Sequence, residues 1–158
     1  MRDLTDDVAL MRPVIDALRA SGSDPDRVLA RVGLPAGSLP AGRFPHSAQN
    51  LFWKAAAEEC GEEHVGLYLA GHLPAFHGLL LEYLFLSSAT FGEGLRHALR
   101  YVRLLSDTLN ARLEVEGEKA VLLLGHTAGT NRHFPEMLAG AVVRLFHALT
   151  EGDFKPHE

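Results

Sequence analysis

The stretch His77–Ser106 constrains the fold most strongly, because two helix patterns meet there across a short polar break. Gly78–Leu86 is almost uniformly apolar, with Glu82 as the charged exception. The run is longer than an average strand and far too short to span a bilayer, so it predicts a helix that is buried on all sides. Ser87–Ala89 then ends the apolar run.

A second helix is predicted to begin at Thr90. Thr90 and Glu93 have the spacing of a capping box, in which the Thr90 hydroxyl accepts a hydrogen bond from the Glu93 amide. Apolar residues then recur along one face and arginines along the other, which is typical of an amphipathic helix with a solvated basic face. The apolar positions are Leu95, Leu99, Val102 and Leu105, and the basic positions are Arg96, Arg100 and Arg103.

The residues before this stretch predict several shorter helices. We expect Met1–Arg12, which contains three aspartates, to be frayed or loosely helical. Asp24 suits the N-cap of one helix and Pro25 its first position, and Ser47 is expected to cap another. The predicted helices run from Pro13 to Gly22, from Pro25 to Gly33, from Ser47 to Gly61 and from Glu62 to Gly71. The first two also allow a helix-turn-helix interpretation, which their acidic residues disfavour.

After the central stretch the hydrophobic period changes from that of a helix to that of a strand. Thr108–Glu116 alternates apolar and polar residues, Gly117 marks a turn, and Lys119–Leu124 follows as a second strand. A two-stranded hairpin alone is marginal in water, so we expect it to pack on the helices and to pair with further strands. The chain thus predicts an α+β fold. It has a mostly helical N-terminal part of five to six helices, a small antiparallel sheet with its hairpin near 108–124, and a long helix near 134–151.

Composition limits the possible functions. The 158 residues suit one domain with a real core. A formal charge of −5 argues against DNA binding by this chain itself, because phosphate contacts need clustered basic side chains. Cys60 is the one cysteine, which excludes an internal disulfide and a cysteine-based zinc site. The absence of a signal peptide or transmembrane run predicts a cytoplasmic protein without membrane contact.

Nine histidines make a metal site the first alternative to consider. His72 and His77 are five residues apart in a loop, and His126 and His133 flank another loop, so neither pair has helical ligand spacing. Cys60 lies on an apolar helix face, where a thiol is normally inert. We therefore expect no metal, no cofactor and no catalysis. A haem sensor remains an alternative on topology alone, because no axial histidine stands out.

A mostly apolar pocket with a few polar groups is easier to place, where the helices meet the strands. Glu82 and Tyr83 interrupt the apolar helix, and a buried carboxylate there needs a partner. His77 stands at the entrance of that helix, and His97 and Tyr101 lie at the edge of the next apolar stripe. These five are the candidate ligand-binding residues. For the two tyrosines, an ordinary role as core aromatics is the alternative.

The order Y-L-F-L-S-S-A-T-F-G-E-G-L-R-H-A-L-R-Y within Gly78–Tyr101 resembles a known family. It is similar to the N-terminal, arabinose-binding-like regulatory domain of AraC-type bacterial transcription regulators, in the branch typified by ornithine-utilisation regulators. The resemblance continues through Ala17–Leu34, Leu51–Ala70, the strand pair and the closing helix, in the family's order.

The resemblance implies one domain over residues 1–158 that binds a small effector, mediates homodimerisation, or does both. DNA would be bound only by a C-terminal helix-turn-helix domain that this sequence lacks. Because family members continue past Phe154–Pro156 into further strands, we expect the chain to be truncated at its C-terminal end. A haem- or metal-binding sensor and a purely structural dimerisation module are the alternatives. The family does not identify the effector.

Overall fold

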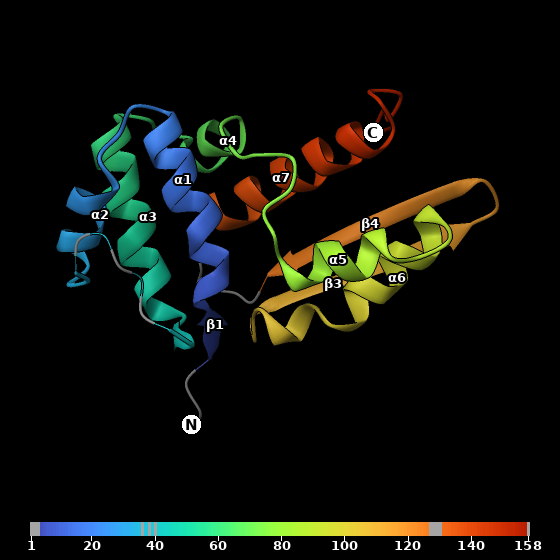
Figure 1. Ribbon diagram of the computed structural model, residues 1–158, viewed down its shortest axis with the longest axis horizontal. Coiled ribbons are helices and arrows are strands. Elements are labelled where there is room, and N and C mark those ends of the chain that lie inside the picture. Colours follow the sequence, from blue (N-terminus) through green and yellow to red (C-terminus); the bar gives the residue numbers. More distant parts are fainter. Residues whose placement is uncertain (1–3, 36, 38, 40, 127–130, 158) are drawn as a thin grey trace.

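One long helix, α7 (His133–Leu149), connects the two ends of the molecule (Figure 1). The computed structural model describes residues 4–157 apart from positions 36, 38, 40 and 127–130. Helix α7 packs against α4 (Val65–Ala70) at one end and against the strand β4 (Lys119–His126) further along. The other elements group around these two regions of α7.

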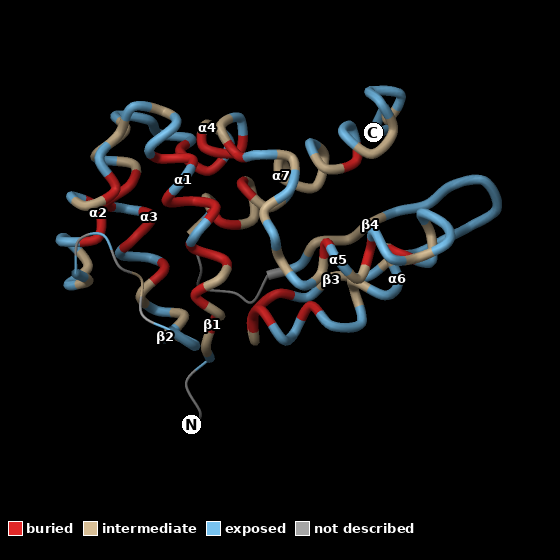
Figure 2. The backbone as a smooth tube through the Cα atoms, viewed as in Figure 1, coloured by how far each residue is buried: buried red, intermediate tan, exposed pale blue. Residues whose placement is uncertain are grey.

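The first group is helical. It consists of α1 (Met11–Ala20), α2 (Pro25–Arg31), α3 (Ser47–Cys60) and α4, together with the start of α7. The main hydrophobic core lies among them, and Figure 2 shows buried backbone concentrated there. Its most deeply buried side chains include Val14, Leu18, Val28, Leu29, Phe52, Trp53, Ala56, Val65 and Leu69. As predicted, Asp24 caps α2 by accepting from the Asp26 amide at 3.0 Å, and Pro25 opens the helix.

The second group contains the predicted helix pair and hairpin. The strands β3 (Leu109–Glu116) and β4 are antiparallel, with Leu109 opposite His126 and Glu116 opposite Lys119. Helix α6 (Phe91–Arg100) packs on β3, and α5 (Leu80–Leu86) packs on α6. The hairpin turns at Gly117, whose φ of 58° lies in the left-handed region that favours glycine.

The described residues confirm the α+β class. They form seven α-helices and two antiparallel two-stranded sheets, with six of the helices before the hairpin and the long one after it. Thr90 caps α6 as predicted, since its hydroxyl accepts from the Glu93 amide at 3.3 Å. Within this part of the chain, the helices fall short of the length and apolar character that crossing a membrane requires.

The beginning of the chain differs from the expectation of loose helix. Thr5–Asp7 is a strand, β1, that pairs antiparallel with β2 (Arg43–Pro45), and a 3-10 turn over Val8–Leu10 leads into α1. A three-residue strand shows no readable period, so the sequence carried no signal for it. Its pairing depends on a segment almost forty residues away, which only the tertiary fold brings close.

A buried polar cluster around Asp6 holds β1 in place. The Asp6 carboxylate accepts hydrogen bonds from His46 Nδ1 at 2.5 Å, from Gln49 Nε2 at 2.8 Å and from Ser106 Oγ at 2.5 Å. These bonds join the chain start to α3 and to the segment that enters β3. They also explain why Ser47 is the first residue of α3 and not its cap: the cap position is His46, whose side chain faces Asp6.

The helix pair itself differs from prediction in two respects. Helix α5 begins at Leu80 and is not buried on all sides, because Leu80, Tyr83 and Leu86 are about half exposed or more on its outer face. An apolar run does not reveal that its helix lies in an outer layer. Helix α6 ends at Arg100, and the apolar stripe continues into a 3-10 turn over Val102–Leu104.

The hairpin also lacks the additional strands that were expected. In the described part of the chain β3 and β4 form a sheet of two, and the 3-residue pair β1–β2 forms the other sheet. Helices α6 and α7 pack on the hairpin strands. Burial against helices therefore supplies the stability that further strand pairing was expected to supply.

Helices α4 and α7 approach so closely that two glycines are required between them. A Cβ added at Gly66 would lie 2.1 Å from the carbonyl oxygen of His133, and one added at Gly140 would lie 2.5 Å from the Cβ of Ala70. Both neighbours are rigid, one being backbone and the other a β-carbon. A side chain at either position would force the two helices apart.

Replacing Gly140 by Ala should therefore lower the free energy of unfolding by about 1–3 kcal/mol, the usual cost of overpacking. The matched control is Gly92→Ala in α6, where the nearest atom to the added Cβ is the flexible end of Arg96 at 3.7 Å. That control should be neutral or stabilise by up to about 1 kcal/mol through helix propensity. Urea unfolding measures both, and equal stability of the two variants would contradict the close packing.

Candidate ligand-binding site

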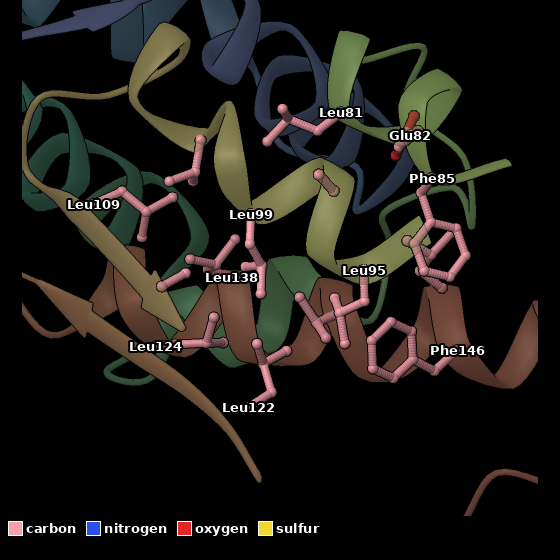
Figure 3. Close-up of a pocket in the computed structure, with 15 residues that line it drawn as sticks. Leu81, Glu82, Phe85, Leu95, Leu99, Leu109, Leu122, Leu124, Leu138 and Phe146 are labelled. Atoms are coloured by element: carbon pink, nitrogen blue, oxygen red, sulfur yellow. The ribbon is translucent and has the colours of Figure 1, made fainter. Parts of the chain in front are cut away.

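Two apolar cavities lie along α7, the first of them between α5, α6, the hairpin and α7. The first has a volume of about 130 Å³, and its walls come from all five elements (Figure 3). Its lining residues are Leu81, Glu82, Phe85, Leu95, Ala98, Leu99, Val102, Leu109, Ala111, Leu122, Leu124, Leu138, Val142, Leu145 and Phe146. Apart from Glu82, every lining side chain is apolar, so this cavity offers shape and hydrophobic contact.

The second cavity, also about 130 Å³, lies toward the helical group. It is lined by Leu10, Pro13, Leu73, His77, Leu79, Glu82, Phe134, Met137, Leu138, Ala141, Val142 and Leu145. Four residues belong to both linings, namely Glu82, Leu138, Val142 and Leu145. The cavities are therefore neighbours, separated by side chains of α5 and α7.

Helical and strand periodicity explains how these side chains reach the cavities. Leu138, Val142 and Leu145 are spaced by four and three residues, so they form one stripe on α7. Leu109 and Ala111 are two apart on β3 and share its inner face, as Leu122 and Leu124 do on β4. Each cavity-lining face is thus an ordinary amphipathic face whose side chains leave space between them.

Aromatic rings close the first cavity at the far end of α7. Phe146 stacks on Phe85 with ring centroids 6.3 Å apart and meets Phe91 edge-on at 4.8 Å. Phe154, beyond the end of α7, packs edge-on against Phe146 at 5.2 Å. These edge-to-face contacts are favourable for aromatic rings and fix the end of α7 against α5 and α6.

Glu82 is the charged residue at the junction of the two cavities, and its carboxylate is fully engaged. Oε1 accepts from His77 Nδ1 at 2.5 Å and from the His77 amide at 3.0 Å. Oε2 accepts from the His77 amide at 2.9 Å and from the Leu79 amide at 3.0 Å. In Figure 3 the Glu82 oxygens lie beside α5, away from the leucines of the cavity wall.

These hydrogen bonds lower the pKa of Glu82 below its ordinary value of 4.5. Burial by itself raises the pKa of this carboxyl, but the bonds from the His77 ring, the His77 amide and the Leu79 amide outweigh burial. Glu82 is therefore ionised at neutral pH. Since an ionised carboxylate only accepts hydrogen bonds, His77 Nδ1 must carry the proton that it donates.

The far ring nitrogen of His77 is left without a partner. Only 7% of the His77 side chain is exposed, and its Nε2 is buried and makes no hydrogen bond to a described residue. His77 lines the second cavity, where the other lining side chains apart from Glu82 are apolar. Buried polar atoms are normally paired, so this nitrogen is an exception among the described residues, and it is buried from the cavity as well as from solvent.

The five residues expected to bind a ligand therefore lie in different places. His77 and Glu82 are in direct contact at the cavities, and His77 is the partner that the buried carboxylate needed. Tyr83 and Tyr101 are 64% and 42% exposed and line neither cavity, so they are not core aromatics either. His97 is exposed, and its Nδ1 lies 2.9 Å from the Ser88 hydroxyl. A binding role for all five residues stays a prediction.

Most of the cavity lining was missed as a binding surface. The apolar faces of α6, β3 and α7 were recognised, but as core, because sequence periodicity shows which way a face points and not how tightly it packs. Leu10, Pro13 and Leu73 come from the helical group, and no local signal links them to α5. Residues that come together only in the tertiary fold share no sequence pattern that would identify them as one site.

Metal-ligand side chains do not converge here. Among the described residues, no three His, Cys, Asp or Glu side chains are placed to hold a metal ion. His72 Nδ1 lies 3.0 Å from the Tyr68 carbonyl oxygen, and the side chain of His126 is outside the described part. Burial raises the pKa of the Cys60 thiol, which keeps it protonated and unreactive.

An α+β domain with apolar cavities and one polar pair has the features of a small-molecule sensor. Comparison with known families agrees: residues 22–158 match the arabinose-binding N-terminal domain of AraC transcription regulators. The chain belongs to this family of ligand-sensing regulatory domains, which is not an enzyme family. No curated protein matches the chain. The ornithine-utilisation branch stays a prediction.

Replacing Glu82 tests how much its carboxylate stabilises the fold and how that stabilisation depends on pH. Glu82→Gln should lower the free energy of unfolding at pH 7 by about 1–3 kcal/mol, because at least one buried donor loses its acceptor. Since the native pKa is depressed, the stabilisation is present above pH 4.5 and is lost as pH falls through the native value. The difference between wild type and variant should therefore shrink as the pH falls below 4.5.

Urea unfolding across that pH range measures the effect. Glu58→Gln is the control, because Glu58 forms an exposed ion pair with Arg31 and should change stability by less than about 1 kcal/mol. A Glu82→Gln variant as stable as Glu58→Gln at pH 7 would contradict the role of the Glu82 hydrogen bonds.

Proposed function

We propose that the chain is the effector-sensing domain of an AraC-type regulator and that a small effector binds in the paired cavities. The observation that carries this proposal is two neighbouring apolar cavities that meet at Glu82. Protein interiors are close-packed, so side chains that line an unfilled apolar space lack the contacts that they would make in a packed core. An effector that fills such a space restores the missing contacts.

The position of the cavities supports regulation as well as binding. The walls of the first cavity combine α5, α6 and the hairpin with α7, and the second cavity combines Glu82 and α7 with Leu10, Pro13 and Leu73. An effector in the second cavity would contact residues of both groups and stabilise their arrangement relative to each other. We propose that this arrangement controls DNA binding by a C-terminal helix-turn-helix domain, and that α7, which precedes the C-terminal end, transmits it.

Effector binding can be tested by thermal unfolding in a broad screen of amino acids, sugars, alcohols, phenols and fatty acids. A ligand that binds the folded state at 100 times its Kd stabilises it by about 2.7 kcal/mol, so Tm should rise by several degrees. Including zinc and haemin in the same screen tests the metal- and haem-sensor alternatives. A rise in Tm with haemin or zinc alone would favour those alternatives.

Cavity-filling variants then locate the site. Ala98→Leu should fill the first cavity and Ala141→Leu the second, whereas Ala139→Leu adds the same atoms at an exposed position of α7. At least one of the first two variants should weaken a stabilising effector tenfold or more while Ala139→Leu leaves its affinity unchanged. Equal affinity in all three variants would place the effector elsewhere and overturn this site.

Dimerisation is a separate prediction that rests on the family. Sedimentation equilibrium should show a reversible dimer whose population rises with protein concentration. A strict monomer at the highest attainable concentration would contradict dimerisation and would leave effector sensing untouched.

A further inference from the structure

We infer that the free edge of β3 is a dimerisation surface, at which β3 pairs antiparallel with β3 of a second copy of this chain. The two hairpins would then form one four-stranded sheet. This inference deepens the dimerisation proposed above, rests on it and names its interface. It follows from the open edge of β3, the exposure of the hairpin and the order of the charges along the strand.

The edge of β3 that faces away from β4 has no strand beside it. Within the described part of the chain, β3 pairs with β4 alone and makes no other backbone-to-backbone hydrogen bond. In an antiparallel ladder the N–H and C=O groups of a strand point alternately to its two sides. The groups on the free side of β3 can therefore pair with another strand.

The outer half of the hairpin is open to solvent. Every residue from Glu114 to Val121 is exposed, and Figure 2 shows this end of the hairpin as exposed. The side chains of Arg112 and Glu114 are 73% and 52% exposed. A second strand can therefore approach this part of the edge, and the added pairing would stabilise a sheet that has only two strands in the described residues.

The outward face of β3 is self-complementary in charge in one antiparallel register. This face carries Asn110, Arg112, Glu114 and Glu116. With Leu113 on the two-fold axis, Arg112 lies opposite Glu114 of the second copy, and symmetry repeats this pair. The same register places the Asn110 amide, a hydrogen-bond donor, opposite the Glu116 carboxylate. Opposite charges directly across an antiparallel pair stabilise it, so this register is favoured.

Other arrangements bring like charges together. A shift by two residues places Arg112 opposite Arg112 of the second copy in one direction, and Glu114 opposite Glu114 in the other. In-register parallel pairing would oppose every charged residue to its own copy. Charged side chains on an edge strand normally prevent unwanted pairing, and here their mixed order blocks these arrangements and leaves one.

The edge of β4 provides no comparable specificity. Its run Ala120–Leu124 is apolar throughout, so it carries no charge pattern that selects a partner or a register. The charges therefore favour β3 as the edge that a second copy recognises.

Arg112 and Glu114 also interact within one chain. Arg112 Nε lies 2.9 Å from Glu114 Oε1, on a face where both side chains are largely exposed. Such an isolated surface pair contributes little to stability, whereas a network of several charges contributes more. Pairing of two β3 strands would convert two separate ion pairs into one network of four alternating charges.

Charge reversal on the whole 158-residue chain tests the register. Arg112→Glu and Glu114→Arg each create two like-charge pairs across the two-fold axis, so each should weaken the dimer about tenfold or more. The double variant R112E/E114R restores opposite charges and should dimerise within about threefold of wild type. Sedimentation equilibrium measures the dissociation constants.

A mixture of the two single variants separates pairing between copies from the ion pair within one chain. Each single variant has lost the Arg112–Glu114 pair of its own chain. In a 1:1 mixture one chain is acidic at both positions and the other is basic at both, so a heterodimer should form although neither variant dimerises well alone. Arg96→Glu is the matched control, because Arg96 is exposed on α6 and the change in charge is the same. It should leave the dimer unchanged, and circular dichroism checks that every variant is folded.

Hydrogen exchange locates the contact independently of any substitution. At high protein concentration the amides on the free side of β3, within Ala111–Val115, should exchange more slowly than at low concentration. The amides of Ala120–Leu124 on β4 should change little.

Three results would overturn the inference and leave dimerisation at another surface. They are a wild-type dimer that both single variants retain, a double variant that dimerises no better than the single ones, and concentration-dependent protection of β4 in place of β3. A strictly monomeric wild type would contradict both this inference and dimerisation itself. Effector sensing would stand in either case, because its test is the binding of a ligand.

Discussion

The contact between α4 and α7 is the constraint on which the arrangement of the two groups depends. Gly66 and Gly140 remove the side chains that would separate these helices, so α7 is fixed against the helical core. The rest of α7 then extends over the hairpin, where Val142 and Leu145 face both cavities. Because one rigid helix serves as core at one end and as cavity wall at the other, packing in the helical group positions the candidate site.

Buried polar groups act as the second organising element, at two places with different consequences. Around Asp6 every described bond joins distant segments, which closes the chain start onto α3 and the entrance to β3. Around Glu82 the bonds are local, and they hold His77 with one ring nitrogen used and the other open. The first arrangement is structural. The second fixes Glu82, the one charged residue that lines both cavities, with its carboxylate already hydrogen-bonded.

Prediction from sequence succeeded where the signal is local and periodic. The caps at Asp24 and Thr90, the hairpin and the long closing helix all follow from patterns within about twenty residues. It failed where contacts between distant segments determine burial or secondary structure. Helix α5 has an exposed face, and β1 is a strand that pairs with residues 43–45. For the candidate site, the need of Glu82 for a partner was readable. The exposure of Tyr83 and Tyr101 was not, because an aromatic on an apolar helix has the same sequence appearance in a core and at a surface.

By itself, the sequence determined the class of fold and the family, because the amphipathic patterns and their order can be read directly along the chain. It also determined that a charged residue within the apolar run Gly78–Leu86 had to find a hydrogen-bonding partner. Only the tertiary structure decided which apolar faces pack tightly and which enclose space, since a cavity is the volume left between side chains of five elements. It also decided that His77 and Glu82 line such a space as a hydrogen-bonded pair, because burial and pairing depend on contacts that no local pattern encodes.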